Sequence, residues 1–491
     1  MAGMWSPVGA PPIIGVRVPP RDAINALAEN DRVIANLVDV LVVDEPSAGA
    51  DPLSHDAACD WMRPRVRSDP VFHRRLRRRF CDLGDPFWID DRDVDVAEHV
   101  VVEQITESGW GQIERHISRV LATPMRLDRS CWEVHFLTGV RGIEAIPDGA
   151  TIVVVLVHHS SMDGLGLVSV VRGLFGPHDP AAPNGPVRER RGDAMPTAMP
   201  PLRREVAAAM PRTVSFVRTL IATSRAAATR AHPHRPATRF NGHISMEHRI
   251  RVLFLDLARL RAIKNAAPWA TVNDILLTAV SLALSRYLDE MDEAPAATLS
   301  ATMPLDLSPA MPAPEHRAPP VAANRTTFVD VDLHTCEDDA LSRLRAVHES
   351  ASDAKRFARD VIAPRAAGPF DVAPAALLRV IGTVSALMSR RRRTTASGTV
   401  SSNTVVSNMP HGDATLTFRG SPVVSAFMPM PTVDGVGLIH HIASLGTNVA
   451  VTVTVDRTMM DDPDRYVQLL EGAVSTLENA ATQRVTDTAT S

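Results

Sequence analysis

The segment TIVVVLV at 151–157 restricts the fold of this chain more than any other feature. An unbroken run of β-branched and aliphatic residues indicates a strand that is buried on both faces. Such a strand needs a covering layer on each side, which is typical of an α/β protein. The residues at 162–175 then have apolar side chains at helical spacing. We therefore expect the strand to pass into a helix through a short loop.

Strands and helices continue to alternate along the 491 residues. Apolar periodicity predicts helices at 71–83, 112–124, 272–291 and 464–482, and strands at 249–257, 326–335, 398–409 and 448–456. The pattern favours an N-terminal domain over residues 1–180 and a C-terminal domain over residues 239–491. A Pro-rich linker and a crossover helix occupy 181–238, and we expect Pro211 to kink or break that helix.

Composition excludes several classes of protein. The formal net charge of −4 gives no general reason to bind nucleic acid. The four cysteines are scattered and form no CxxC pair, which indicates a reducing compartment rather than a disulfide framework. The N-terminus has no basic and apolar signal pattern, and no apolar run of about 20 residues is present. We expect a cytoplasmic protein.

The loop after the buried strand carries the residues suited to catalysis. A histidine at the end of a buried strand keeps its ring inside the protein and still faces a cleft, and His is the commonest general base near neutral pH. His159 takes this place, Asp163 would hold the loop through an Arg or backbone N–H groups, and Gly164 would leave room for a ligand. The alternative interpretation is that His159 is a core residue whose ring has found hydrogen-bond partners. A second pair, His440 and His441, lacks the following Asp-Gly and is interpreted as structural.

Other common catalytic motifs are missing from the sequence. There is no GxSxG elbow for a serine hydrolase, no HExxH or other convincing metal spacing, and no Walker loop. A reaction that needs only a base and two bound substrates, without a metal, is left open.

The segment HHSSMDG at 158–164 matches HHxxxDG, the signature of the superfamily of CoA-dependent acyltransferases. Condensation domains and chloramphenicol-type acetyltransferases share this motif or a close form, so further segments narrow the choice. The chain resembles the bacterial wax ester synthase/diacylglycerol acyltransferases in RLDRSCWEVHFLTG, TRFNGHISMEHRI, TVNDILLTAVSLALSRYL, VVSNMPHG and the closing DGVGL. These segments stand in the family's order between about residues 72 and 477.

The chain departs from this family in three places. Ser130-Cys131-Trp132 replaces the usual Pro-Leu-Trp, and Met409-Pro410-His411-Gly412 replaces the Pro-Gly-Pro after the Ser-Asn pair. The first fifty residues lack the family's usual opening. We expect such segments to line the substrate channel, so these changes bear on the choice of acyl acceptor.

The resemblance implies two chloramphenicol-acetyltransferase-like domains with an active-site tunnel between them. It implies transfer of a long-chain acyl group from acyl-CoA, which is a substrate and not a cofactor, to diacylglycerol or a long-chain alcohol. His159 would be the general base, and His158 would orient the site or pack. Asp163 would have a structural role in the site, and Gly164 would give clearance for the pantetheine arm.

Four further residues come from the family's later motifs. Asn273 is the candidate oxyanion donor, although Asn273-Asp274 is equally explained as a helix start. Ser407-Asn408 would line the channel or simply end a strand.

The segment 372–393 is apolar, helix-like and ends in four arginines. It suits either a helix on an anionic membrane or lipid droplet, at the inner face of the cell membrane, or a core helix with a basic end.

Two alternative functions stay open. One is a non-catalytic lipid-binding or droplet-associated relative, and the other is an acyltransferase of the superfamily that acts on a different hydroxyl or amine.

Overall fold

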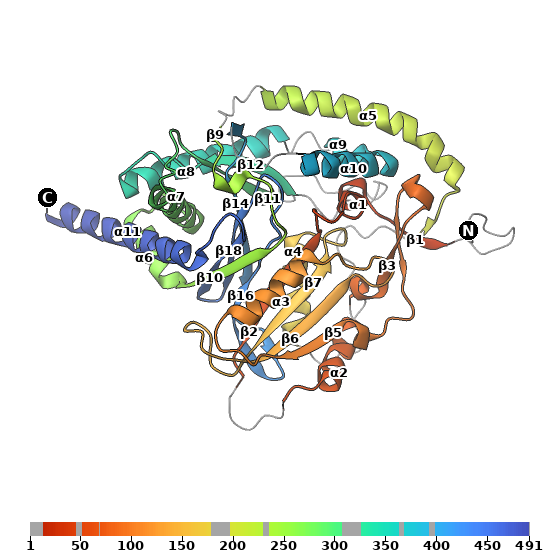
Figure 1. Ribbon diagram of the computed structural model, residues 1–491, viewed down its shortest axis with the longest axis horizontal. Helices are drawn as coiled ribbons and strands as arrows, with labels where there is room; N and C mark the ends of the chain where they lie inside the picture. The colour runs from red at the N-terminus through yellow and green to blue at the C-terminus, as the bar shows by residue number, and fades with distance from the viewer. Residues whose placement is uncertain are drawn as a thin grey trace.

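The computed structural model describes residues 13–45, 52–67, 69–177, 197–228, 235–306, 326–362, 368–391 and 398–490. The described chain forms two six-stranded sheets with helices packed around them, and a long helix, α5, runs across one side (Figure 1). The mixed α/β architecture predicted from the sequence is confirmed.

The N-terminal sheet is built around the predicted strand, β7, which is buried along its whole length. Val153, Val155 and Val157 pack into one core, and the alternate residues of β7 pack into another. The prediction of a strand buried on both faces is therefore confirmed. The order of this sheet is β15 (Thr417–Phe418), β16 (Ser421–Phe427), β2 (Asn36–Val43), β7 (Ala150–His158), β6 (Trp132–Val140) and β5 (Val100–Gln104).

The C-terminal sheet holds the remaining long strands. Its order is β10 (His248–Asp256), β18 (Asn448–Asp456), β17 (Leu438–Leu445), β14 (Thr404–Gly412), β11 (Ser300–Asp306) and β12 (Thr326–Asp332). The central strands β11, β14 and β17 run parallel to one another, whereas β10, β18 and β12 pair antiparallel.

One segment of the C-terminal half joins the N-terminal sheet. Strand β16 pairs antiparallel with β2, with Phe427 opposite Val40. The predicted division into 1–180 and 239–491 therefore does not separate the two sheets, because the chain leaves β14, adds β15 and β16 to the first sheet, and returns at β17. Sequence periodicity identifies a strand but not the sheet that it joins.

Two small sheets and eleven α-helices complete the described chain. The small sheets contain β3 (Arg74–Arg77), β4 (Phe87–Asp90), β1 (Ile14–Arg17) and β8 (Thr197–Ala198), and β13 (Thr399–Val400) with β9 (Arg235–Pro236). The helices are α1 (Pro20–Leu27), α2 (His55–Val66), α3 (Gly111–Ala122), α4 (Gly164–Phe175), α5 (Leu202–Ala228), α6 (Leu257–Ala266), α7 (Val272–Glu290), α8 (Ala340–Phe357), α9 (Pro369–Val372), α10 (Ala375–Arg391) and α11 (Pro463–Thr490).

The helix predicted at 71–83 is wrong. The segment contains two short 3₁₀ turns with β3 between them, and β3 pairs with β4 so that Leu76 lies opposite Trp88. Apolar residues at 72, 76 and 80 imitate helical spacing. Pairing with β4 overrides this local pattern. Of the three residues, Phe72 and Leu76 are buried and Phe80 is exposed, so they do not form one buried helical face.

Of the kink or break expected at Pro211, the break does not occur, since α5 continues through Pro211 from Leu202 to Ala228. A proline inside a helix frees the carbonyl four residues earlier, here that of Ala207. Ala207 is exposed, so water can satisfy this carbonyl. Figure 1 shows α5 as one curved helix. The last helix, α11, extends to Thr490, eight residues beyond the end predicted at residue 482.

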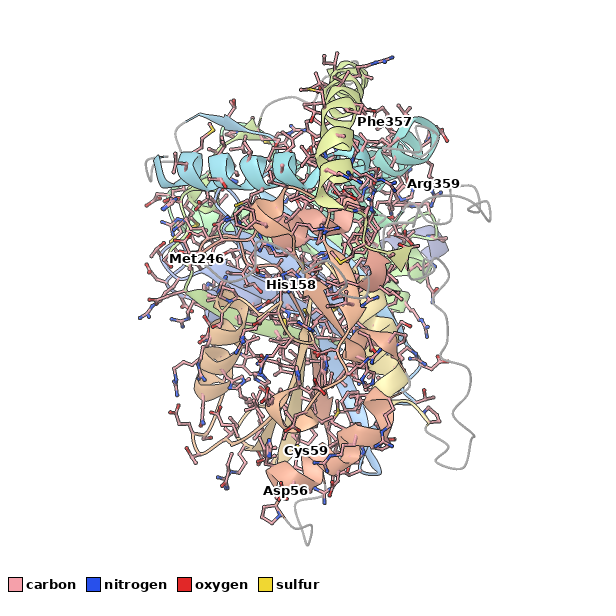
Figure 2. The ribbon with its side chains drawn as sticks, turned by 90° about the vertical axis from the view of Figure 1, so that its right-hand side faces the viewer. Asp56, Cys59, His158, Met246, Phe357 and Arg359 are labelled. Atoms are coloured by element: carbon pink, nitrogen blue, oxygen red, sulfur yellow. The ribbon has the colours of Figure 1, made fainter. Side chains whose placement is uncertain are left out.

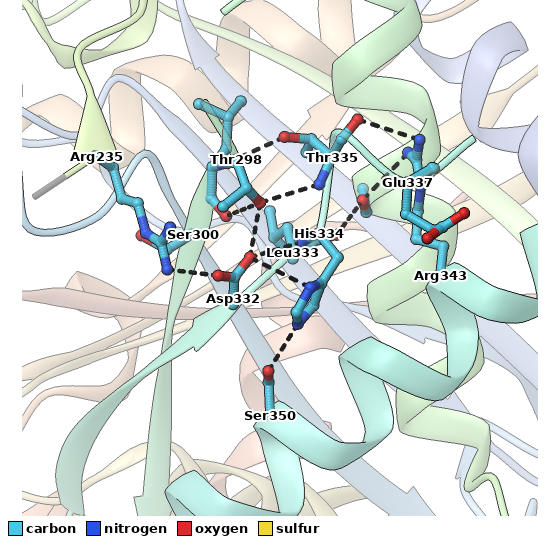
Figure 3. A network of polar contacts seen from close by, with 12 residues as sticks. Arg235, Thr298, Ser300, Asp332, Leu333, His334, Thr335, Glu337, Arg343 and Ser350 are labelled. Carbon is cyan, nitrogen blue, oxygen red and sulfur yellow. Dashed lines mark hydrogen bonds and ion pairs between the residues drawn. The ribbon is translucent and has the colours of Figure 1, made fainter. Parts of the chain in front are cut away.

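The crossover segment is fixed to the C-terminal sheet by the polar network of Figure 3. Asp332, at the end of β12, accepts hydrogen bonds from Arg235 at 2.5 Å and from the hydroxyl of Thr298 at 2.7 Å. The ring of His334 reaches Ser350 of α8 at 2.8 Å. The network joins the end of the crossover, the edge of the sheet and a covering helix, far along the chain from the histidine loop.

Candidate active site

The histidine motif lies where β7 ends and α4 begins. The backbone N–H of His159 donates to the carbonyl of Ala35 at 2.8 Å, and Asn25 donates to the carbonyl of His159 at 3.3 Å. Figure 2 shows His158 in the middle of the molecule, well away from Cys59 near one end. The loop is therefore held by the chain around β2 and α1.

His158 is a fully buried residue with a defined tautomer. The backbone N–H of Ser160 donates to its Nδ1 at 3.2 Å, so Nδ1 is an acceptor and the ring proton is on Nε2. Nε2 lies 3.5 Å from the Glu29 carboxylate, which also accepts from the backbone N–H of Ala35 at 3.0 Å. These contacts agree with the packing or orienting role predicted for His158. Sequence reasoning did not identify Glu29, which carries no local motif.

His159 is half-buried as a residue, and its ring atom Nδ1 is buried. Burial lowers the pKa of His159, and hydrogen bonds with the backbone at His159 and Met162 offset only part of that shift. A lowered pKa keeps the imidazole neutral at physiological pH. His159 is thus in the protonation state that a general base requires.

Asp163 is the N-cap of α4. Its carboxylate accepts a hydrogen bond from the backbone N–H of Gly166 at 2.9 Å, which satisfies one of the open donors of the first helical turn. The loop is thereby fixed at both ends, at Asp163 and at the β7 terminus. Asp163 has the loop-holding contact that the sequence suggested.

The space beside Gly164 is filled by the chain itself. A Cβ at Gly164 would lie 2.1 Å from Cε and 2.3 Å from Sδ of Met409, on β14. The glycine therefore permits close approach of Met409, whereas the sequence suggested clearance for the pantetheine arm. Met409 is a functional candidate that sequence reasoning named only as part of a departing segment.

The two residues of the Asn-Asp motif have different environments. Asp274 is buried in a capping box with Thr271, accepting from its backbone N–H at 2.9 Å, and also contacts Nδ1 of His348 at 2.7 Å. Asn273 instead accepts a hydrogen bond from Asn408 at 3.2 Å. The structure thus brings Asn273 and Asn408 together and assigns Asp274 to the start of α7. The substrate-binding role of Asp274 stays a prediction.

Ser407 is buried in β14, where it lies opposite His441 of β17. Its neighbour Met409 is on the same strand face, because side chains alternate along a strand. Strand β14 therefore connects the Ser-Asn pair to Gly164 of the histidine loop.

A buried ion pair at the end of β14 was not predicted. His411 Nε2 and the Asp39 carboxylate of β2 are 2.8 Å apart, and both side chains are fully buried. Burial lowers the pKa of His411, but the Asp39 charge more than offsets this effect, so the net shift is upward. Arg172 of α4 donates to the carbonyls of His411 and Asp413. These contacts fix β14 against the N-terminal sheet, and the only sequence signal was that His411 stands within the departing segment.

This fold, with the HHxxxDG loop between two sheets, defines the class of two-domain acyltransferases and condensation domains. Over 95% of this chain, it is similar to the whole solved chain of a wax ester synthase/diacylglycerol acyltransferase from Marinobacter aquaeolei VT8, with 21% identity and a TM-score of 0.64. The first condensation domain of the calcium-dependent antibiotic synthetase is similar over 96% of each chain, with 16% identity and a TM-score of 0.55.

The chain belongs to the wax ester synthase/diacylglycerol acyltransferase family. The family model of the catalytic domain matches residues 19–276, and the model of the C-terminal domain matches residues 322–478. A protein of Mycobacterium tuberculosis with the provisional name diacylglycerol O-acyltransferase is 26% identical over 410 residues, covering 79% of this chain and 81% of its own. A second protein with the same name, from the same organism, is 25% identical over 457 residues, which cover 90% of this chain and 95% of that protein.

Family membership confirms the resemblance and makes the chain an acyl-CoA-dependent O-acyltransferase. The non-catalytic lipid-binding alternative and the different-acceptor alternative are not favoured. Within the described ranges, no group of His, Cys, Asp or Glu side chains is arranged to hold a metal ion. None of the helices there combines the length and apolar character that crossing a membrane requires.

Proposed function

We propose that the protein transfers an acyl group from acyl-CoA to a lipid hydroxyl, and that His159 is the general base of this reaction. The observation that carries the proposal is a neutral histidine at the end of β7, whose backbone is bound to Ala35 and which is followed by the helix that Asp163 caps. An alcohol hydroxyl is a weak nucleophile until a base takes its proton. His159 removes that proton as the oxygen attacks the thioester carbonyl.

The remaining steps need no covalent enzyme intermediate and no separate cofactor. The tetrahedral intermediate collapses, the carbon–sulfur bond breaks, and CoA leaves as a thiolate, a good leaving group because thiols have a pKa of about 8.5. The proton on His159 then returns to the CoA sulfur. A well-placed base contributes about 10²–10⁴-fold to the rate.

Asn273 is the proposed donor to the oxyanion. Its side-chain oxygen is occupied by Asn408, which orients the amide so that Nδ2 is directed elsewhere. This Nδ2 atom is buried and has no hydrogen-bond partner among the described residues. A donor that is already oriented stabilises developing negative charge without reorganisation.

The proposed substrates are acyl-CoA and either diacylglycerol or a long-chain alcohol. The names of the relatives refer to diacylglycerol, and the Marinobacter protein is named for wax ester synthesis and for diacylglycerol acylation. The proposed site for both substrates is a tunnel between the two domains that reaches His159.

We further propose that α5 and α10 contact an anionic lipid surface, such as the inner face of the cell membrane or a droplet. Large apolar side chains are exposed at helical spacing on both helices: Val206, Met210, Val214, Val217 and Ile221 of α5, and Val380, Val384, Leu387 and Met388 of α10. Met210 is 72% exposed and Met388 is 57% exposed. Contiguous exposed apolar surface of this kind marks an interaction site.

Charge supports a lipid partner for these helices. The sequence of α10 contains no acidic residue, and the single acidic residue of α5, Glu205, is buried against Arg17. Exposed Arg203, Arg204 and Arg218 flank the apolar stripe of α5. Basic residues beside an apolar helix face favour anionic lipid. Of the segment 372–393, residues 392–393 and the side chains of 389–391 lie outside the described residues.

The testing experiment measures CoA release from a long-chain acyl-CoA, with diacylglycerol or a long-chain alcohol as acceptor. The unchanged chain and His159→Ala are compared, and we expect the substitution to lower acceptor-dependent release by about 10²–10⁴-fold. Equal release from both proteins contradicts the role of His159. Absence of acceptor-dependent release from the unchanged chain contradicts the substrate assignment.

A further inference from the structure

Three polar side chains form a row across the middle of the C-terminal sheet. Ser407 of β14 lies opposite His441 of β17, and His441 lies opposite Thr452 of β18. Residues directly opposite each other in neighbouring strands point to the same face of a sheet. All three side chains are at most 1% exposed.

The row contains polar atoms that the protein does not satisfy. Ser407 Oγ, both ring nitrogens of His441 and Thr452 Oγ1 are buried without a hydrogen-bond partner among the residues that the structure describes. A buried polar group without a partner destabilises a protein, and native proteins pair nearly all of them. Four unpaired atoms side by side therefore indicate a site for an external polar group.

The adjacent histidine shows that this is a property of the face and not of the strand. His440 points to the opposite face, where Nε2 contacts the hydroxyl of Tyr466 at 2.9 Å and Nδ1 contacts Thr404 at 3.1 Å. Its face packs on helices, whereas the face of His441 is directed toward the N-terminal domain.

The row lies beside the histidine loop. Met409 is two residues from Ser407 on the same face, about 7 Å along the strand, and Met409 contacts Gly164. At the other end of the row, Val252 is opposite Thr452 and packs against a core that contains β2 and β7 residues. Both ends of the row thus meet the N-terminal domain, one of them at the HHxxxDG loop.

The chemistry of the row selects an uncharged ligand. Hydroxyl groups donate and accept hydrogen bonds, and burial lowers the pKa of His441 to about 3, so its ring is neutral. The row carries no charge for the phosphates of CoA. It matches ester or hydroxyl oxygens, which a diacylglycerol presents in addition to its reacting hydroxyl and which a long-chain alcohol lacks.

We propose that Ser407, His441 and Thr452 bind the ester oxygens of a glyceride acceptor while its free hydroxyl meets His159. The proposal rests on the function proposed above and deepens it by naming diacylglycerol as the preferred acceptor. These three are specificity residues and not catalytic groups, because none of them touches the reacting atoms.

The test compares kcat/KM for diacylglycerol and for a long-chain alcohol in Thr452→Val. Valine keeps the shape of threonine and removes its hydroxyl. Thr454→Val is the matched control, since Thr454 is buried on the same face of the same strand but lies outside the row. We expect Thr452→Val to lower kcat/KM for diacylglycerol about tenfold and for the alcohol less than about twofold. Thr454→Val leaves the ratio of the two values unchanged.

Several outcomes overturn the proposal. An equal fall for both acceptors, or no change in their ratio, contradicts it. If the unchanged chain transfers acyl groups to the alcohol alone, this inference fails and the proposed acyl transfer stands. If neither acceptor supports CoA release, both fail. If Thr452→Val does not fold, the same two kcat/KM values are measured for Ser407→Ala.

Discussion

The two histidine pairs of this chain have the same sequence and different surroundings. His158 and His159 stand where β7 ends, so the chain turns between them and the helix capped by Asp163. His440 and His441 stand inside β17, with strands on both sides. Protein contacts fix the ring of His158 through Ser160 and Glu29, and the ring of His440 through Tyr466 and Thr404.

The difference lies in what the second ring faces. His159 is partly exposed beside a loop, whereas His441 is fully buried in a sheet face. A base needs access to a reacting hydroxyl, which a strand end provides and a strand centre does not. The position of a histidine within its strand therefore separates catalysis from binding or packing more clearly than the residue pair does.

The largest expected effect on stability comes from His440. His440→Ala leaves a cavity and removes the partner of the Tyr466 hydroxyl, so we expect the free energy of unfolding to fall by about 2–4 kcal/mol. Chemical denaturation measures this fall. His159→Ala, at a partly exposed site, costs much less. Equal destabilisation by the two substitutions contradicts the difference between the surroundings of His440 and His159.

A smaller effect is expected at Asp163. Asp163→Ala removes the N-cap of α4 and lowers the free energy of unfolding by about 1 kcal/mol, with a loss of acyl transfer because the loop is released. Asp163→Asn keeps a capping oxygen and serves as the control. Retained transfer in Asp163→Asn supports a positioning role, whereas equal loss in both variants shows that the negative charge itself is required.

The pH dependence of transfer sharpens the role of His159. Burial lowers the pKa of His159, so the neutral base persists below the ordinary histidine value of about 6.5. We expect kcat/KM to fall with an apparent pKa below that value as the pH is lowered. An acid limb above about pH 7 contradicts this expectation.

The pH dependence of stability tests the pair of His411 and Asp39. The pKa of His411 is raised in the folded chain, so its stabilisation is fully present below the unfolded value of about 6.5 and is lost as the pH rises through the folded value. The stability difference between the unchanged chain and Asp39→Asn should therefore shrink as the pH is raised across this range. A constant difference over that range contradicts the charged pair.

The sequence by itself determined the strand at 151–157, the loop with His159 and Asp163, and the start of α7 at Asn273-Asp274. Each of these depends on local patterns: a run of β-branched residues, a capping residue and helical periodicity. The wrong helix at 71–83 shows the limit of this reasoning, because pairing with β4 decided its structure.

Only the tertiary structure decided which distant residues meet. It added β16 to the N-terminal sheet, placed Met409 against Gly164, paired Asp39 with His411, and aligned Ser407, His441 and Thr452 in one row. The place of β16 beside β2 is set by contacts between segments hundreds of residues apart. A period of two along one strand fixes which residues share a face, but it does not determine what that face meets.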